Sequence, residues 1–263
     1  MRVLLTNDDG IFAEGLHALR KELEEVEGLE LFIVAPDRER SASAHAITIH
    51  RPLHVEELNL DEGRSRAWAV NGTPADCTKL AVEAILRDRP DLVISGINRG
   101  SNLGTDVFYS GTVSAAIEGA ILGLPSIAVS LATWENPDYT AAARYTRLLA
   151  LKVAEVGLPP YTLLNVNVPP LDEQEIAGVA ITRLGVRRYT NVFDRRVDPR
   201  GRVYYWMAGE VDDPDADPES DVMAIKNNMI SVTPLHLDLT YHRLRNDLPN
   251  WDGILKFPVS ECN

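Results

Sequence analysis

Residues 3–10 of the chain read VLLTNDDG, a short apolar run that turns abruptly into a polar loop. The same layout recurs at residues 31–43, LFIVAPDRERSAS, and at residues 92–102, LVISGINRGSN. Apolar residues at helical spacing occupy the interval before each of these later segments, in residues 15–26 and 73–88. Strands that alternate with helices predict βαβ units and a parallel sheet.

Extended to the whole chain, this pattern predicts an α/β fold with a doubly wound, mostly parallel sheet in a single domain, residues 1–263. The core is expected to cover about residues 1–185, with a further strand at 229–235. Two extended runs around DPRG, residues 198–201, predict a β-hairpin arm within about 186–226. Residues 236–263 are expected to form a C-terminal segment with a short helix.

Composition limits the possible partners of the chain. A net charge of −13 argues against binding to nucleic-acid polymers, which require a basic face. A small phosphorylated substrate stays possible, because a local cation can reverse the field. The sequence has no apolar run of about 18 residues and no signal-peptide pattern at its start, so no membrane partner and a cytoplasmic location are expected.

Asp8 and Asp9 are adjacent at the end of the first predicted strand. Two carboxylates that converge where a strand turns into a loop repel each other unless a cation neutralises them. A helix N-cap is the alternative explanation, because acidic residues favour that position, but one Asp suffices for a cap. The pair therefore favours a metal site.

Oxygen-bearing side chains follow the other two strands as well. Ser41 and Ser43 lie after the second strand, and Asn98 and Asn102 lie in the loop expected after the third. Ligands of open parallel sheets bind outside the carboxyl ends of the strands. An all-oxygen ligand set selects Mg²⁺, Mn²⁺ or Ca²⁺ over zinc.

The triplet Ser110, Gly111 and Thr112 precedes a helix rich in small residues. Backbone N–H groups and the positive end of the helix dipole favour an anion there, which makes the triplet a candidate phosphate site. A plain helix cap explains the triplet equally well. No Walker A sequence and no GxGxxG after the first strand is present, so dinucleotide binding is not expected.

Other motifs carry less weight. The run Asp213, Asp215 and Asp217 resembles the start of a calcium loop, but Pro218 replaces the required glycine, and we expect a solvated, mobile loop. The histidines fit no common metal spacing and are expected to be structural. Cys77 is expected to be a free core residue.

These residues together resemble the SurE family of survival-protein nucleotidases. The matching stretches are LLTNDDG at 4–10, APDRERSASAHAIT at 35–48, NGTPADC at 71–77, SGINRGSNLGTDVFYSGTVSAAIEG at 95–119 and SVTPLHLDLT at 231–240. The resemblance implies a Rossmann-like core and a metal-dependent enzyme that hydrolyses nucleoside 5′- and 3′-monophosphates, in some members also short polyphosphate. It also implies a homodimer or homotetramer, in which we expect the arm to pack on a neighbour.

The resemblance also implies roles for individual residues. Asp8, Asp9, Ser41 and Asn98 would bind one divalent ion, Mg²⁺ or Mn²⁺, with Asp8, Asp9 and Asn98 forming the catalytic centre. The substrate phosphate would contact Ser43, Asn102, Ser110, Gly111 and Thr112. Asn7 stands where an aspartyl-phosphate enzyme needs its nucleophile, so water is the expected attacker, with Asp9 favoured slightly over Asp8 as the proton acceptor. The alternative is a regulatory protein that binds metal and nucleotide without catalysis.

Overall fold

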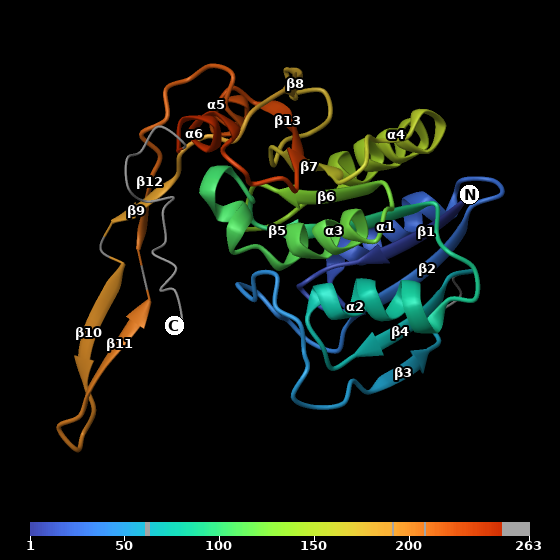
Figure 1. The fold of residues 1–263 in the computed structure, drawn as a ribbon, viewed down its shortest axis with the longest axis horizontal. Coiled ribbons are helices and arrows are strands. Elements are labelled where there is room, and N and C mark those ends of the chain that lie inside the picture. Colours follow the sequence, from blue (N-terminus) through green and yellow to red (C-terminus); the bar gives the residue numbers. More distant parts are fainter. Residues whose placement is uncertain (61–63, 191, 208, 249–263) are drawn as a thin grey trace, which may run out of the picture.

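A computed structural model describes residues 1–60, 64–190, 192–207 and 209–248 of the chain, and a single large sheet forms its centre (Figure 1). This nine-stranded sheet confirms the predicted α/β class. Its strands, in spatial order, are β3 (Val55–Leu58), β4 (Arg66–Val70), β2 (Glu30–Pro36), β1 (Arg2–Thr6), β5 (Leu92–Arg99), β6 (Ser126–Leu131), β7 (Thr162–Val168), β13 (Met229–His236) and β8 (Gly178–Ile181).

The strand directions create a crossover point at the middle of the sheet. β1 pairs in parallel with β2 on one side and with β5 on the other. The chain first moves outward from β1 through β2 and then returns to the opposite side of β1, so the strand order reverses between β1 and β5. Ligands of doubly wound sheets bind at such a reversal, outside the carboxyl ends of the strands. The antiparallel pairs β3–β4 and β7–β13 lie farther out.

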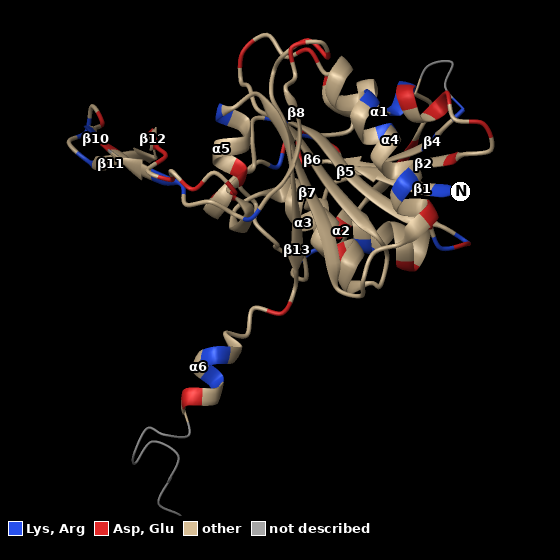
Figure 2. Cartoon of the chain, turned by 90° about the horizontal axis from the view of Figure 1, so that it is seen from above, with Lys and Arg blue, Asp and Glu red and all other residues tan. Residues whose placement is uncertain are grey.

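Helices cover both faces of the sheet (Figures 1 and 2). α1 (Glu14–Glu24) and α4 (Thr140–Val156) pack together on one face, while α2 (Pro74–Leu80) and α3 (Gly111–Ile121) pack together on the other. Leu16, Leu19 and Leu23 of α1 are fully buried against the sheet, as their spacing predicts. A π-helical turn, Ala81–Ile85, extends α2 toward β5. In the described part of the chain, no helix is long and apolar enough to span a membrane.

Local sequence explains where two of these helices begin. Thr73 caps α2 in a reciprocal arrangement, because its side chain accepts from the Asp76 backbone N–H while the Asp76 carboxylate accepts from the Thr73 N–H. Ser110 caps α3 by accepting from the Val113 N–H at 3.1 Å. The predicted capping function of the triplet 110–112 is therefore present.

The arm projects to one side of the core (Figure 1). Its outer hairpin pairs β10 (Phe193–Val197) with β11 (Val203–Met207), and its inner pair joins β9 (Arg188–Thr190) to β12 (Glu210–Asp212). The turn between β10 and β11 contains the DPRG sequence that predicted it. A short helix, α5 (Asp221–Lys226), leads from the arm back to β13. α6 (His242–Asp247) stands away from the core in Figure 2, and residues 249–263, with Cys262, lie outside the described residues.

One predicted boundary was wrong. The sequence suggested that the third strand ends at Ile94, but β5 continues to Arg99, so Asn98 lies in a strand rather than in a loop. The pairing of β5 with β6 shifts register between Ser95 and Asn98. Gly96 makes this irregularity possible, because it has a φ of +133° and a side chain there would meet the Val129 carbonyl oxygen.

Candidate active site

The predicted site residues after β1 and on β5 meet at the reversal point of the sheet. Asp8 and Asp9 directly follow β1, and Asn98 lies near the end of the neighbouring strand β5. The backbone N–H of Arg99 donates to Asp9 Oδ2 at 3.1 Å, which ties the two strand ends together. Asn7 stabilises the turn that leads from β1 to α1, because its side chain donates to the Gly10 carbonyl and accepts from the Gly10 N–H.

Asp8 is buried against the first turn of α3. Its Oδ1 atom accepts a hydrogen bond from the Thr112 hydroxyl, and its backbone C=O accepts from the Arg40 N–H at 2.7 Å. Burial raises the pKa of Asp8 to about 7, although the hydrogen bonds of Thr112 oppose that change and the charge of Asp9 adds to it. A carboxyl group in this state needs either a proton or a cation.

Gly111 allows that close approach. A Cβ atom at this position would lie 2.8 Å from Asp8 Cβ and 2.9 Å from Asp8 Oδ2. The glycine predicted to approach a phosphate therefore also admits the Asp8 carboxylate, and Thr112 orients it. These contacts join the candidate metal residues directly to the candidate phosphate residues.

Asp9 is more accessible than Asp8. Burial raises its pKa, the Arg99 N–H lowers it and the nearby Glu39 carboxylate raises it again. Its hydrogen bond from the Arg99 N–H uses only the Oδ2 atom. The lower burial of Asp9 is what distinguishes it from Asp8, and its role as the proton acceptor stays a prediction.

Asn98 is a buried polar residue whose orientation is fixed by the backbone. Its Nδ2 atom donates to the Gly100 carbonyl at 2.8 Å. Because the amide nitrogen is used in this way, the Oδ1 atom is the end of the side chain available to a cation. The ligand role expected for Asn98 stays a prediction.

The segment after β2 crosses over the same edge of the sheet. Its backbone is bonded to the site on both sides, through the Arg40 N–H to Asp8 and the Ala44 N–H to the Tyr109 carbonyl at 3.2 Å. Ser41, between these anchors, is exposed and donates to Glu39 Oε1 at 2.7 Å. Ser43 has a buried hydroxyl that has no hydrogen-bond partner among the residues described.

The far end of that segment is held by a cluster that includes a histidine. His45 Nε2 lies 2.9 Å from Glu118 Oε2, and Lys79 Nζ lies 3.1 Å from Glu118 Oε1. Glu118 is buried on α3, and the histidine and lysine hydrogen bonds lower its pKa despite its burial. His45 is therefore held by a hydrogen bond with Glu118, and the structural role expected for the histidines stays a prediction.

Asn102 lies in a polar cradle built by β6 and β7. Its backbone N–H donates to Asn167 Oδ1 at 2.8 Å, and its carbonyl accepts from Asn165 and Asn167. Its own side chain donates to Ser130 Oγ at 2.7 Å. This cradle was not predicted from the sequence, although asparagines at alternate positions of a buried strand indicate that one face of β7 is polar.

The donor set fits a hard divalent cation. The pKa values of Asp8 and Asp9 are both raised, and the Asn98 amide and nearby hydroxyl groups supply neutral oxygens beside them. In the described ranges, no group of three His, Cys, Asp or Glu residues could hold a metal. Such a shell would therefore be completed by neutral oxygen ligands, which Mg²⁺ and Mn²⁺ accept.

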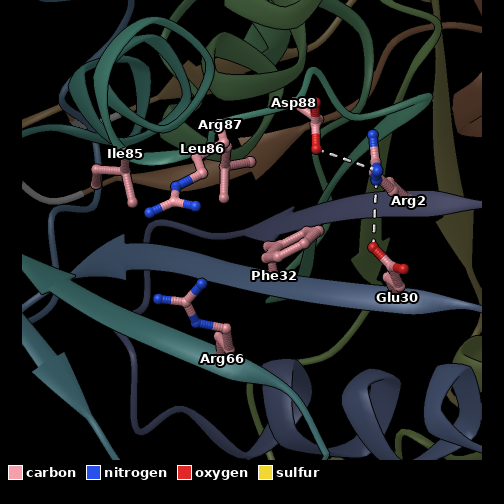
Figure 3. Close-up of a pocket in the computed structure, with 8 residues that line it drawn as sticks. All are labelled: Arg2, Glu30, Phe32, Arg66, Ile85, Leu86, Arg87 and Asp88. Carbon is pink, nitrogen blue, oxygen red and sulfur yellow. Dashed lines mark hydrogen bonds and ion pairs between the residues drawn. The ribbon is translucent and has the colours of Figure 1, made fainter.

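A separate hollow, of about 410 Å³, lies at the amino ends of the strands, opposite the ends that carry the candidate site (Figure 3). Arg2, Glu30 and Arg66, at the amino ends of three strands, line it. Arg2 is already paired with Glu30 and Asp88, at 3.2 Å in each case. Ion pairs occupy the rim of this hollow, which lies at the strand ends away from Asp8, and we assign no chemistry to it.

Comparisons with known proteins find relatives that match nearly the whole chain. The family model described as "Survival protein SurE" matches residues 3–191. The chain is 56% identical to a 5′-nucleotidase SurE of Heliobacterium modesticaldum, over 100% of this chain and 96% of the relative. It is 57% identical to a 5′-nucleotidase SurE of Symbiobacterium thermophilum, over 95% of this chain and 98% of the relative.

The fold is similar to a solved structure as well. The crystal structure of the SurE protein from Aquifex aeolicus superposes with a TM-score of 0.82 at 41% sequence identity. The alignment covers 95% of this chain and 99% of the other. The similarity thus includes the arm region and is not confined to the central sheet.

Proposed function

Because the chain belongs to the SurE family of survival proteins, we propose that it hydrolyses nucleoside 5′-monophosphates to nucleoside and phosphate with the help of one divalent ion. The names of its curated relatives support the nucleotidase activity predicted from the sequence. The observation that carries the metal assignment is the geometry: Asp8 and Asp9 directly follow β1, and Asn98 lies near the end of the neighbouring parallel strand β5. Burial raises the pKa of both carboxyl groups, which a bound cation would offset.

The proposed metal ligands are Asp8, Asp9, Ser41 and Asn98. When bound, the ion supplies positive charge to the phosphoryl oxygens and lowers the pKa of a coordinated water. Mg²⁺ and Mn²⁺ both suit these oxygen donors. Ser41 donates its hydroxyl proton to Glu39 Oε1 in this structure, which leaves the lone pairs of its oxygen available to a cation.

The chain's own residues divide the remaining work. The Thr112 hydroxyl donates to Asp8 and so keeps its carboxylate in place. The bond from Asn98 Nδ2 to the Gly100 carbonyl keeps the amide oxygen of Asn98 in place. Asp9, through its second oxygen, accepts the proton of the attacking water. The N-terminus of α3 around Gly111, with Asn102 and Ser43, holds the phosphoryl oxygens as charge moves to the leaving group.

The monoester preference follows from charge and space. A terminal phosphoryl group carries two charges and exposes three oxygens, whereas a diester offers less charge and more bulk. The net charge of −13 also disfavours a long polyanion. Action on 3′-monophosphates and short polyphosphate, and the cytoplasmic location, stay predictions.

The decisive experiment measures phosphate release from a panel of nucleoside monophosphates, with a dinucleotide diester as comparison, against Mg²⁺, Mn²⁺ and excess EDTA. We expect metal-dependent release from AMP and slow cleavage of the diester. Metal binding without any phosphate release would instead favour a regulatory protein. Faster cleavage of the diester than of AMP would overturn the substrate class.

The nucleophile has its own test. Attack by water on a chiral phosphate inverts the configuration at phosphorus, whereas a covalent intermediate gives net retention. Asn7 occupies the position where an aspartyl phosphate would form and is bonded to Gly10, so we expect inversion. Retention, or a phosphoenzyme trapped by acid, would contradict the mechanism while leaving the metal site in place.

A further inference from the structure

The loop of residues 100–110 connects β5 to α3 and carries two residues of the proposed phosphate site. Asn102 lies near its start and Ser110 at its end. A 3-10 helix, Gly104–Phe108, occupies its middle. Because α3 begins at the end of this loop, a displacement of the loop would move Asn102 relative to the α3 N-terminus.

One side of the loop contacts the base of the arm, defined here as residues 185–189. Arg187 reaches across with one guanidinium nitrogen, which lies 3.1 Å from Ser101 Oγ and 3.0 Å from Asp106 Oδ2. The Thr105 hydroxyl donates to the Arg187 carbonyl at 2.8 Å, and the Tyr189 hydroxyl donates to Asp106 Oδ2 at 2.7 Å. Loop and arm base are therefore joined by four hydrogen bonds.

Asp221 adds a second link beneath these contacts. Its two carboxylate oxygens accept from the Gly104 N–H and the Gly185 N–H, each at 2.8 Å. The side chain is fully buried, and a Cβ atom at Gly104 would lie 2.7 Å from the Gly185 carbonyl oxygen. The two backbones thus approach each other as closely as glycine permits.

Arg187 also balances the charge of this junction. Its side chain is 13% exposed and lies between Asp106 and Asp213, 3.0 Å from each. Removal of the guanidinium would leave two largely buried carboxylates near each other without a counterion. Their repulsion would push the loop away from the acidic segment that packs beside the arm base.

The aspartates of the acidic segment 213–217 are half-buried and paired, whereas the sequence predicted a solvated loop. Asp213 pairs with Arg187, Asp215 accepts from the Val186 N–H at 2.9 Å, and Asp217 pairs with Arg183. The sequence could not reveal this, because the arginine partners lie some 26 to 34 positions earlier in the chain.

We propose that Arg187 is a positioning residue for the phosphoryl site: it fixes the loop of residues 100–110 from the arm side and so sets the place of Asn102 and Ser110. The inference rests on the proposed nucleotidase function for its catalytic consequence. It assigns the arm base to the activity of its own chain, in addition to any contact that the arm makes with a neighbour.

The test compares Arg187→Ala with Arg187→Lys and with Arg183→Ala. Arg183 is the matched control, because it also pairs with the acidic segment, whereas its other side-chain bond goes to the Leu184 carbonyl and not to the loop of residues 100–110. KM and kcat for AMP and the metal concentration giving half activity are measured for each. Amide hydrogen exchange of residues 100–112 is followed in the same proteins.

For Arg187→Ala we expect a KM about tenfold higher, a smaller change in kcat, unchanged metal dependence and faster exchange in the loop. Arg187→Lys should recover part of the KM, since its ammonium supplies the charge without the planar fork. Arg183→Ala should match the parent. Asp106→Asn provides a second variant that keeps the shape of the junction, and we expect its loop exchange to rise too.

A KM within twofold of the parent for Arg187→Ala, or loop exchange unchanged in both Arg187→Ala and Asp106→Asn, would overturn the inference. An equal loss in Arg183→Ala would also overturn it, because a general disturbance of the arm would then explain the result. A parent enzyme that is inactive toward all nucleotides would overturn the proposed function instead. Loop exchange would still decide whether Arg187 holds the loop.

Discussion

The carboxyl ends of the central strands bury polar residues, whereas the outer hairpin of the arm exposes large apolar residues. At the sheet edge, Asp8, Asn98 and Asn102 are buried polar groups with fixed partners. In the hairpin, Tyr205 and Trp206 are large apolar groups left 59% and 61% exposed. The first arrangement suits a cation and a phosphate, and the second suits another protein surface. Chemistry and assembly are therefore expected to respond to different substitutions.

Loss of the first carboxylate should have the largest effect. Asp8→Asn removes one negative charge from the proposed cation site, and we expect AMP turnover to fall by about a thousandfold or more. The fold should survive, because the neutral amide removes the need to bury a charge. Phosphate release and a thermal melt measure the two effects. Full activity of the parent in excess EDTA would show that the buried polar groups at the strand ends do not hold a required cation.

The contact between Gly111 and Asp8 provides the next test. Gly111→Ala places a methyl group 2.8 Å from Asp8 Cβ, so the carboxylate must move, and we expect about a hundredfold loss of kcat/KM. Thr112→Ser is the matched variant, because it keeps the hydroxyl that orients Asp8. If the Gly111→Ala variant is as active as the parent, this contact does not position the site.

The raised pKa of Asp8 predicts a pH dependence of stability in metal-free protein. Both folded and unfolded chains hold the proton below the ordinary value of 3.8, and the unfolded chain loses it first as pH rises toward about 7. The contribution of Asp8 to the free energy of unfolding therefore falls over that range. Melting curves in EDTA should show Asp8→Asn gaining on the parent from about pH 4 to about pH 7. Parallel curves would contradict the assignment.

Substitution of the arm hairpin should have the smallest effect on turnover. Tyr205→Ser with Trp206→Ser removes exposed apolar surface, so we expect a smaller particle by light scattering and kcat/KM within about threefold of the parent. The arm base stays intact in this variant and still holds the loop of residues 100–110. An intact parent that is already a monomer at micromolar concentration would refute the predicted homo-oligomer.

The sequence was most informative where pattern alone determines structure. Alternating strands and helices predicted the doubly wound sheet, and DPRG predicted the hairpin. The family and the nucleotidase activity predicted by resemblance agree with the matching relatives. Asp8, Asp9 and Asn98 were expected to share one edge, because parallel strands bring their carboxyl ends together.

Contacts between distant segments could not be predicted in the same way. Nothing near Asn102 in the sequence indicates that Asn165 and Asn167 hold its backbone, since β7 becomes its neighbour only after the sheet forms. Arg187 and Asp106 are separated by 81 positions, and each alone looks like a surface charge. The end of β5 was misplaced because Ser95 and Gly96 are typical loop residues, and the register shift that keeps them in the strand depends on β6.

The buried bond between Asp221 and Gly104 spans 117 positions, so it can form only late in synthesis. The residues of the candidate site and the asparagines around Asn102 all precede residue 170 in the sequence. Asp221, which holds the loop of residues 100–110, is translated later. A nascent chain stalled before α5 would hold the chemical groups without the bond that seats them. The loop of residues 100–110 should therefore be fully seated only after α5 has left the ribosome.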